Sequence, residues 1–384
     1  MPTRSRASDV TTGVWAKLAR TTGSKPAAER MIVLFAPDSF KGTLTSVQVA
    51  RALADGWLRA RPDDEILLCP LADGGEGTLE AVAAAGGWDW RTTVVQDPLG
   101  RPVTARWLSA TVDGTPTAVI EMAEASGLSR VASDERDPIT ATSIGTGELL
   151  AAAMNQGHGR IVLGIGGSAT TDGGRGLLEA LPRPPYTFEA DLVVACDVSN
   201  PLLGPDGAAA VFGPQKGATP DQVAFLDARN AAWADTLEAE TSRRERDTPG
   251  AGAAGGVGFA LLASRDRFRS FALRPGVDLV MEATDFDARL ARADLVITGE
   301  GRIDAQTAFG KTALGVAKRA QVAGKPCIGV GGSVEPEGID ALAAVAARAI
   351  PVWETPILLD VALASGHAPL AACGERLARA WHPA

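Results

Sequence analysis

Three lysines beside glycines are the residues in this sequence most suggestive of chemistry. The chain has 7 Lys against 30 Arg, so an ordinary surface cation here is usually Arg. A lysine retained in such a composition is typical of a site that needs a compact ammonium against phosphate. Lys41, Lys216 and Lys311 each adjoin a glycine in a loop-like segment. Either they meet an anionic, phosphorylated ligand, or Lys41 and Lys311 are ordinary loop or first-turn residues.

Five loops that follow predicted strands combine glycine, a hydroxyl group and a carboxylate. They are residues 36–43, 72–78, 164–174, 195–201 and 298–304, the last running on to 310–312. In open α/β sheets, ligands bind beyond the carboxyl ends of the strands. Residues 164–174 make the best phosphate cradle, because glycines let N–H groups point inward, Ser168 and Thr170 offer hydroxyls, and a helix follows. The alternative is a glycine-rich turn without a ligand.

The tripeptide 310–312, Gly-Lys-Thr, is not a standard P-loop. Ala305 stands where a Walker A motif requires its first glycine. A lysine that opens a helix still places its ammonium on a phosphate, and Arg302 would add a second cation.

Carboxylates at strand ends favour a magnesium site. They are Asp38, Asp73, Asp172, Asp197, Glu300 and Asp304. Any one of them alone is more often a cap or turn residue, but Mg²⁺ takes one or two carboxylates together with phosphate oxygens and water. A general base for a hydroxyl nucleophile would come from the same set. Seryl or cysteinyl catalysis is poorly supported, since there is no Gly-x-Ser-x-Gly elbow and no suitable histidine partner.

Alternating strand and helix patterns from Met31 onward predict an α/β protein with parallel sheet. A capping-box pattern, Thr45 to Gln48, predicts a helix start, and one helix is expected over residues 358–381. Residues 90–122 differ, because β-like runs separated by Pro and Gly turns predict antiparallel strands. Two α/β domains follow: a Rossmann-like one built from residues 31–90 and 285–384 of both chain ends, and an inserted one from residues 91–284.

Composition limits the partners and the compartment. A net charge of −9 argues against a non-specific nucleic-acid or anionic-membrane partner. No apolar run approaches the roughly 18 residues that would span a bilayer. The four cysteines lack metal-site spacing and suit buried thiols in a reducing cytosol. Residues 1–30 lack the apolar core of a secretory signal and are expected to be a disordered leader. We expect a cytoplasmic monomer or homodimer.

Eight groups of motifs occur in a fixed order along the chain. They are residues 36–41, 72–78, 121–127, 164–170 with 172–174, 195–198 with 200–201, 211–217, 250–256, and 298–304 with 310–312. Together they resemble the bacterial glycerate kinase family, the type that lacks a P-loop. The resemblance runs from Met31 nearly to the C-terminus, except that residues 182–190 form a shorter connection than expected.

The resemblance implies transfer of the ATP γ-phosphoryl group to D-glycerate, in most members at the 2-hydroxyl, giving 2-phosphoglycerate. It also implies a magnesium requirement and an active site between two α/β domains. The alternatives are phosphorylation at the 3-hydroxyl and a non-catalytic sensor of a phosphorylated metabolite on the same fold. A Rossmann-type oxidoreductase is disfavoured because residues 164–174 hold only half of the dinucleotide fingerprint.

We assign the roles as hypotheses. Asp197 is the predicted base, Lys41 meets the glycerate carboxylate or the transferring phosphoryl, and Asp73 completes the catalytic set. The predicted Mg²⁺ ligands are Asp73, Asp197 and Glu300. The predicted contacts to substrate and nucleotide are Asp38, Ser39, Gly74, Glu76, Gly166, Gly167, Ser168, Asp172, Asn200, Lys216, Glu300, Arg302 and Lys311.

Overall fold

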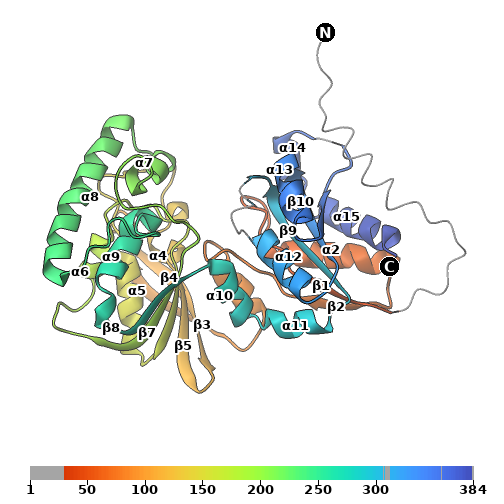
Figure 1. The fold of residues 1–384 in the computed structure, drawn as a ribbon, viewed down its shortest axis with the longest axis horizontal. Helices are drawn as coiled ribbons and strands as arrows, with labels where there is room; N and C mark the ends of the chain where they lie inside the picture. The colour runs from red at the N-terminus through yellow and green to blue at the C-terminus, as the bar shows by residue number, and fades with distance from the viewer. Residues whose placement is uncertain (1–29, 306, 308–311, 356, 383–384) are drawn as a thin grey trace, which may run out of the picture. The chain divides into compact units, whose positions relative to one another are not determined.

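The computed structural model describes residues 30–382, apart from 306, 308–311 and 356 (Figure 1). The chain forms two compact units. Unit 1 holds the described residues up to Ala72, residues Glu80–Ala85, and those from Val280 onward; unit 2 holds Asp73–Leu79 and Gly86–Leu279. Each contains a largely parallel sheet with helices, which confirms the predicted α/β class. The predicted leader, except Arg30, and Lys311 lie outside the described residues.

Unit 1 contains a five-stranded sheet in the order β11-β10-β9-β1-β2. Its strands are β1 (Ile32–Phe35), β2 (Glu65–Leu68), β9 (Leu295–Ile303), β10 (Cys327–Val334) and β11 (Ala347–Pro351), all paired in parallel. β1 lies between β2 and β9, with Phe35 opposite Leu68 on one side and Ile297 on the other. Segments from both ends of the chain therefore build one sheet. The side chains of Leu34 and Phe35 are fully buried, as a central parallel strand requires.

The helices of unit 1 include α2, which begins where the sequence predicts. They are α2 (Ser46–Ala60), α11 (Phe286–Arg292), α12 (Thr312–Val322), α13 (Pro336–Ala343), α14 (Leu359–Ala364) and α15 (Ala368–Ala380). Thr45 caps α2 and makes both capping-box hydrogen bonds with Gln48. The single helix expected over residues 358–381 is wrong: the chain breaks into α14 and α15, and Gly366 adopts a left-handed φ of 59° between them.

Unit 2 contains a six-stranded sheet in the order β3-β4-β5-β6-β7-β8. Its strands are β3 (Asp89–Gln96), β4 (Pro102–Val112), β5 (Thr115–Glu121), β6 (Arg160–Gly164), β7 (Phe188–Ala195) and β8 (Phe268–Arg274). β3, β4 and β5 pair antiparallel, which confirms the reading of residues 90–122. From β5 onward every pairing is parallel. The short segment at residues 182–190 already includes the start of β7, which begins at Phe188.

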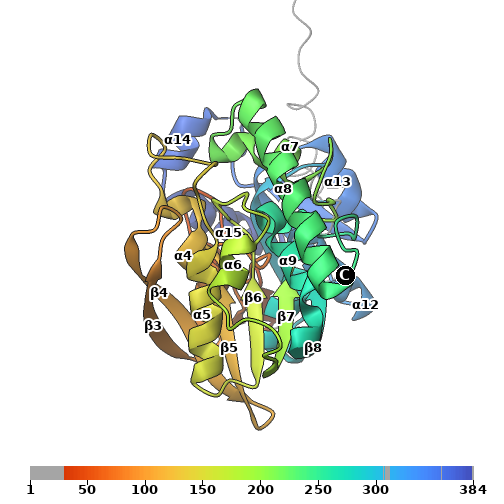
Figure 2. The ribbon, with the colours of Figure 1, turned by 90° about the vertical axis from the view of Figure 1, so that its left-hand side faces the viewer.

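Helices of unit 2 cover its sheet, and in Figure 2 α5, α6 and α8 lie in front of the strands. These helices are α4 (Ala123–Ser126), α5 (Ile144–Asn155), α6 (Arg175–Glu179), α7 (Ala208–Phe212), α8 (Pro220–Thr241) and α9 (Val257–Ala263). Two more, α3 (Thr78–Ala84) and α10 (Gly276–Ala283), lie where the chain passes from one unit to the other. None of the helices in the described part of the chain is long and apolar enough to cross a membrane.

The packing and hydrogen bonds of His158 and the burial of two of the cysteines suit structural roles. His158 is buried, its ring packs edge-on against Trp107, and its two nitrogens contact Ser109 Oγ at 2.8 Å and the Ala153 carbonyl oxygen at 2.9 Å. All four cysteines are unpaired. Burial raises the pKa of the Cys327 and Cys373 thiols to about 12, so these two are unreactive near neutral pH.

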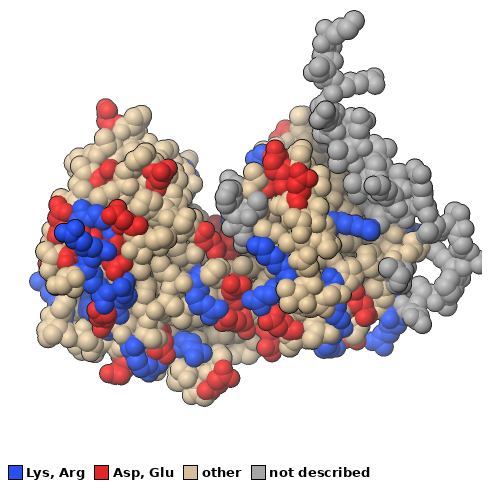
Figure 3. All heavy atoms as spheres, viewed as in Figure 1, with Lys and Arg blue, Asp and Glu red and all other residues tan. Residues whose placement is uncertain are grey.

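Surface charge is mixed. Figure 3 shows basic and acidic side chains intermixed on the face that it presents. In unit 2, ion pairs such as Arg243 with Asp266 and Arg246 with Glu238 join neighbouring segments.

The contact of α2 with α15 gives a test of the fold of unit 1. A Cβ atom added at Gly56 would lie 1.8 Å from the Ala371 carbonyl oxygen. We predict that Gly56→Ala lowers the free energy of unfolding by about 3 kcal/mol, because the two helices must separate. Chemical denaturation measures this. Gly159→Ala, whose Cβ would meet nothing closer than 3.5 Å, is the control; equal losses in both variants would contradict the prediction.

Candidate functional site

Residues 164–174 follow β6 and form a loop whose shape depends on glycine. A Cβ atom at Gly166 would lie 2.6 Å from the Gly75 Cα atom, so this loop and the Asp73–Gly75 segment are in direct backbone contact. Gly167 has a φ of 71°, and Gly173 and Gly174 have φ values of 68° and 70° just before α6. The left-handed conformation favours glycine at these positions. The sequence prediction of a glycine-built turn between a strand and a helix is confirmed.

Lys216 holds this loop from inside the protein. Its Nζ atom donates to Ser168 Oγ at 2.9 Å and to the Thr170 carbonyl oxygen at 2.5 Å. The residue is 2% exposed and ends a short 3₁₀ helix, Pro214–Lys216. Because the ammonium donates to Ser168 Oγ, the hydrogen of that hydroxyl remains available for another acceptor.

Burial lowers the pKa of Lys216 to about 7, while the negative charge of Asp172 acts in the opposite direction. Desolvation disfavours the charged form of a buried lysine. The positive charge behind Ser168 is therefore titratable near neutral pH, unlike that of a surface lysine.

Asp172 fixes the far end of the same loop. Its Oδ2 atom accepts from the N–H and the hydroxyl of Ser143, both at 2.8 Å, and from the N–H of Gly176 at 3.2 Å. Its Oδ1 atom accepts from the Gly174 N–H at 3.1 Å. These contacts tie the loop to the starts of α5 and α6. The observed role of Asp172 is structural, and its contact with a substrate stays a prediction.

Two predicted carboxylates lie at the same edge of the unit 2 sheet. The Gly276 N–H donates to Asp197 Oδ1 at 2.8 Å. A Cβ atom at Gly276 would lie 2.1 Å from the Asp73 carbonyl oxygen, and one at Gly74 would lie 2.6 Å from the Ala195 Cβ atom. Asp73 and Asp197 therefore both adjoin Gly276, at the carboxyl end of β7. Asp197 is exposed and Asp73 is half-buried, so both carboxyl groups can be approached from solvent.

The other predicted residues of unit 2 differ in their surroundings. Glu76 is exposed, and Gly74 is buried with a φ of 82°. Asn200 donates to the Asp206 carbonyl oxygen at 2.8 Å and so stabilises its own turn. Their predicted contacts with a ligand stay predictions.

Unit 1 contains a second cluster, at the carboxyl end of β1 and beside the second half of β9. The Asp38 N–H donates to the Gly299 carbonyl oxygen at 2.8 Å, so the loop after β1 lies beside β9. The prediction that a loop begins at residue 298 is wrong, because β9 continues to Ile303 through its pairing with β10. Asp38 is buried, and its Oδ2 atom accepts from Thr312 Oγ1 at 2.7 Å. Glu300 is also buried and accepts from Thr307 Oγ1 at 2.8 Å.

Around this cluster lie the other predicted residues of unit 1. The Ser39 N–H donates to Asp38 Oδ1 at 2.6 Å, and Lys41 is exposed. Arg302 is exposed and pairs with Asp304 at 3.1 Å and with Glu335. Its hydrogen bond to Glu335 raises the pKa of the guanidinium. A phosphate would have to compete with these two carboxylates for Arg302.

The sequence did not indicate several partners of the predicted residues. Thr307 contacts Glu300, Ser143 contacts Asp172, and Gly276 contacts Asp197.

Of the predicted metal ligands, Asp73 and Asp197 belong to unit 2 and Glu300 to unit 1. Within the residues that the structure describes, no group of three or more His, Cys, Asp or Glu side chains is arranged to hold a metal ion. Two carboxylates still suit Mg²⁺, which keeps water and phosphate oxygens as its remaining ligands.

The titration of Lys216 gives a prediction for stability. Its pKa is about 7 in the folded protein and 10.5 for an ordinary lysine, so between these pH values the unfolded chain binds one more proton. Stability should therefore rise with pH in this window, by up to about 1.4 kcal/mol per pH unit. We predict that the difference in unfolding free energy between the wild type and Lys216→Met rises in favour of the wild type from pH 7 to 9.5.

Urea denaturation at a series of pH values measures this difference. Lys318→Met, which removes an exposed lysine of α12, is the control and should show a flat difference. A flat or falling difference for Lys216→Met would mean that Lys216 stays protonated throughout this range.

Comparison with known proteins finds relatives that are kinases acting on a small hydroxy acid. The family model described as the glycerate kinase family matches residues 33–184 and 182–382. A glycerate kinase of Bacillus subtilis (strain 168) is 43% identical, covering 84% of this chain and 92% of that protein. A glycerate 2-kinase of Escherichia coli (strain K12) is 40% identical, covering 82% and 90%. A crystal structure described as glycerate kinase 2 from Salmonella typhimurium LT2 is 39% identical, with a TM-score of 0.75, covering 91% of this chain and 98% of that one.

Proposed function

The chain belongs to the glycerate kinase family, and we propose that it transfers the γ-phosphoryl group of ATP to the 2-hydroxyl of D-glycerate. The relatives named above support glycerate as the acceptor, and the name of the Escherichia coli relative specifies a 2-kinase. The observation that carries the proposal is the glycine loop after β6, in which a buried lysine holds Ser168. Such a loop suits phosphate oxygens.

Phosphoryl transfer needs positioning and charge neutralisation more than covalent chemistry. The N–H groups of Gly166 and Gly167 and the hydroxyl of Ser168 would donate to phosphate oxygens of the nucleotide. Lys216 would act through Ser168, since its ammonium is buried and bonded to that hydroxyl. Lys311, which lies outside the described residues, would add a cation.

Asp197 is the proposed general base. It stands two residues after the end of β7, and the Gly276 N–H donates to its Oδ1 atom. The carboxylate would take the proton of the glycerate 2-hydroxyl as that oxygen attacks the γ-phosphorus. Asp73 adjoins the same glycine and would keep the local charge negative.

Asp73 and Asp197 would also hold Mg²⁺, with Glu300 as a third predicted ligand. Mg²⁺ held there would offset the negative charge of the nucleotide phosphates. Lys41 would meet the glycerate carboxylate as a point charge. Three of the four cysteines are buried and all four are free, which suits the reducing cytoplasm as the compartment.

A coupled assay for ADP release with D-glycerate, against a panel of other hydroxy acids, tests the activity. NMR of the product separates 2-phosphoglycerate from 3-phosphoglycerate, which is the main alternative. Thermal stabilisation by ATP or glycerate without ADP release would instead support a non-catalytic sensor and would reject the proposed enzyme.

Removal of the proposed base should abolish most of the turnover. We predict that Asp197→Asn lowers kcat by about 10²- to 10⁴-fold, the usual contribution of a general base, with little change in the unfolding transition. Asp206→Asn, at an exposed aspartate nearby, is the matched control and should keep its activity. If Asp197→Asn retains more than about a tenth of the wild-type rate, Asp197 is not the base.

Lys41 provides a separate test of how the substrates are oriented. We predict that Lys41→Ala raises the KM for glycerate by about tenfold or more, because the ammonium that faces the carboxylate is lost. Lys318→Ala, on the exposed side of α12, should change neither KM. A rise in the KM for ATP alone would mean that Lys41 serves the nucleotide instead.

A further inference from the structure

The segment Asp73–Leu79 of unit 2 crosses the carboxyl ends of two neighbouring parallel strands. A Cβ atom at Gly74 would lie 2.6 Å from the Cβ atom of Ala195, the last residue of β7. A Cβ atom at Gly164, the last residue of β6, would lie 2.4 Å from the Gly74 carbonyl oxygen. Since ligands of parallel sheets bind beyond the carboxyl ends of the strands, the position of this segment bears directly on the proposed site.

Glu121 holds the other end of the segment at the next strand of the sheet. It is the last residue of β5, pairs with Gly164 of β6 and is 3% exposed. Its Oε1 atom accepts from the Leu79 N–H at 2.5 Å. Leu79 is the second residue of α3, where a main-chain N–H has no acceptor within the helix. A carboxylate from β5 therefore supplies the acceptor that α3 lacks, and it ties the segment to the sheet.

Hydrogen bonds within the segment shape its turn. Asp73 Oδ1 accepts from the Gly75 N–H at 3.2 Å. The Gly75 carbonyl oxygen accepts from Thr78 Oγ1 at 2.8 Å and from the Thr78 N–H at 3.3 Å. These bonds join residues of the segment to one another. Among the contacts described, its attachment to the sheet comes from the backbone packing at Gly74 and from the hydrogen bond of Glu121.

The stretch that follows Glu121 supports the near half of the glycine loop. The N–H groups of Met122 and Leu128 donate to the carbonyl oxygens of Gly164 and Gly167, respectively, both at 2.8 Å. The motif at residues 121–127 therefore contacts both strand-end loops: its main chain binds the glycine loop, and its first side chain binds the segment that carries Asp73.

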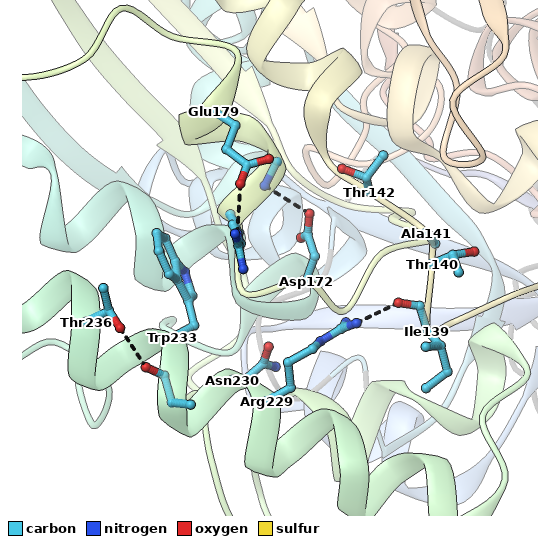
Figure 4. Close-up of a pocket in the computed structure, with 13 residues that line it drawn as sticks. Ile139, Thr140, Ala141, Thr142, Asp172, Glu179, Arg229, Asn230, Trp233 and Thr236 are labelled. Atoms are coloured by element: carbon cyan, nitrogen blue, oxygen red, sulfur yellow. Dashed lines mark hydrogen bonds and ion pairs between the residues drawn. The ribbon is translucent and has the colours of Figure 1, made fainter.

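Helix α8 supports the far half of the glycine loop. Arg229 Nη2 donates to the Thr171 carbonyl oxygen and Trp233 Nε1 donates to the Gly173 carbonyl oxygen, both at 3.1 Å. Figure 4 shows Arg229 and Trp233 on this helix, close to Asp172. The loop is thus supported along its length by other parts of unit 2, and it forms a fixed surface for the segment that packs on it.

We propose that Glu121 is a positioning residue, which sets the place of Asp73 relative to the glycine loop by holding the Leu79 N–H. This inference rests on the proposed function, in which Asp73 and the loop serve the same phosphoryl transfer. Glu121 acts through the main chain and does not touch the substrates. A shift of about 1 Å in a catalytic group can cost about 10²-fold in rate, so the loss of this one hydrogen bond is measurable.

Glu121→Leu tests the proposal, because leucine is of similar size but cannot accept the N–H. We expect kcat to fall by about tenfold or more. The KM values for ATP and glycerate should change by less than about threefold, as for an interaction that matters in the transition state only. Glu121→Gln, whose amide oxygen can accept the same N–H, should keep at least about half of the wild-type kcat. An equal loss in Glu121→Gln would overturn the proposal, because the charge and not the hydrogen bond would then be needed.

Glu148 provides the matched control. Its carboxylate also accepts from a main-chain N–H of unit 2, that of Gln96 at 2.7 Å. Glu148→Leu should lower the Tm but leave kcat unchanged. A loss of kcat equal to that of Glu121→Leu would overturn the proposal, since the removal of any such carboxylate from unit 2 would then have the same effect.

Amide hydrogen exchange of the substrate-free protein tests the placement without relying on activity. Glu121→Leu should speed exchange in residues 73–79 by about tenfold or more, with exchange in α5 unchanged, whereas Glu121→Gln should exchange as the wild type does. Unchanged exchange in residues 73–79 would overturn the proposal. So would faster exchange with an unchanged kcat, because Glu121 would then be structural only. If the wild type itself releases no ADP, the proposed function fails, and the exchange rates alone decide whether Glu121 holds the segment.

Discussion

The contact of the Lys216 ammonium with the loop after β6 is the interaction on which the proposed chemistry depends. Ser168 and Thr170 are both held by one buried cation, so contacts within the protein support the shape of the loop. Burying an ammonium is costly, and a structure retains it where hydrogen bonds and a nearby negative charge compensate. Asp172 supplies that charge at the other end of the loop. Preorganisation of this kind is what electrostatic catalysis requires.

The same loop is supported by cations on two sides. Successive carbonyl oxygens, those of Thr170 and Thr171, accept from Lys216 and Arg229, respectively. The two cations come from different segments, one from a 3₁₀ helix and the other from α8. The loop is therefore a junction where several elements of unit 2 meet, and both cations bind it within three residues of Ser168.

Much of the fold could be predicted from local patterns. The buried strand β1 and the Thr45 capping box follow from hydrophobic runs and from cap chemistry, which involve neighbouring residues only. The break at Gly366 was missed because the apolar pattern continues through it, and β8 was missed because its alternation is weak. Both depend on tertiary context more than on local propensity.

The candidate site was predicted less completely for a related reason. Glycine, lysine and carboxylate residues are concentrated in these loops, so the composition of the loops was enough to single out Ser168 and Lys216. Their partners were not, because Ser143 and Thr307 have no distinctive sequence pattern and meet Asp172 and Glu300 only in the folded chain. The burial of Lys216 also could not be read from a sequence in which it sits beside a glycine in a polar turn.

The central place of β1 in the unit 1 sheet has a consequence for biosynthesis. One neighbour of β1 is made soon after it, but the other, β9, begins at Leu295, and α2 packs on a helix that begins at Ala368. Most of unit 2 is a continuous stretch that leaves the ribosome in between. One edge of β1 therefore stays unpaired until nearly the whole polypeptide has emerged. During this interval the nascent chain is most exposed to misassociation and most in need of a chaperone.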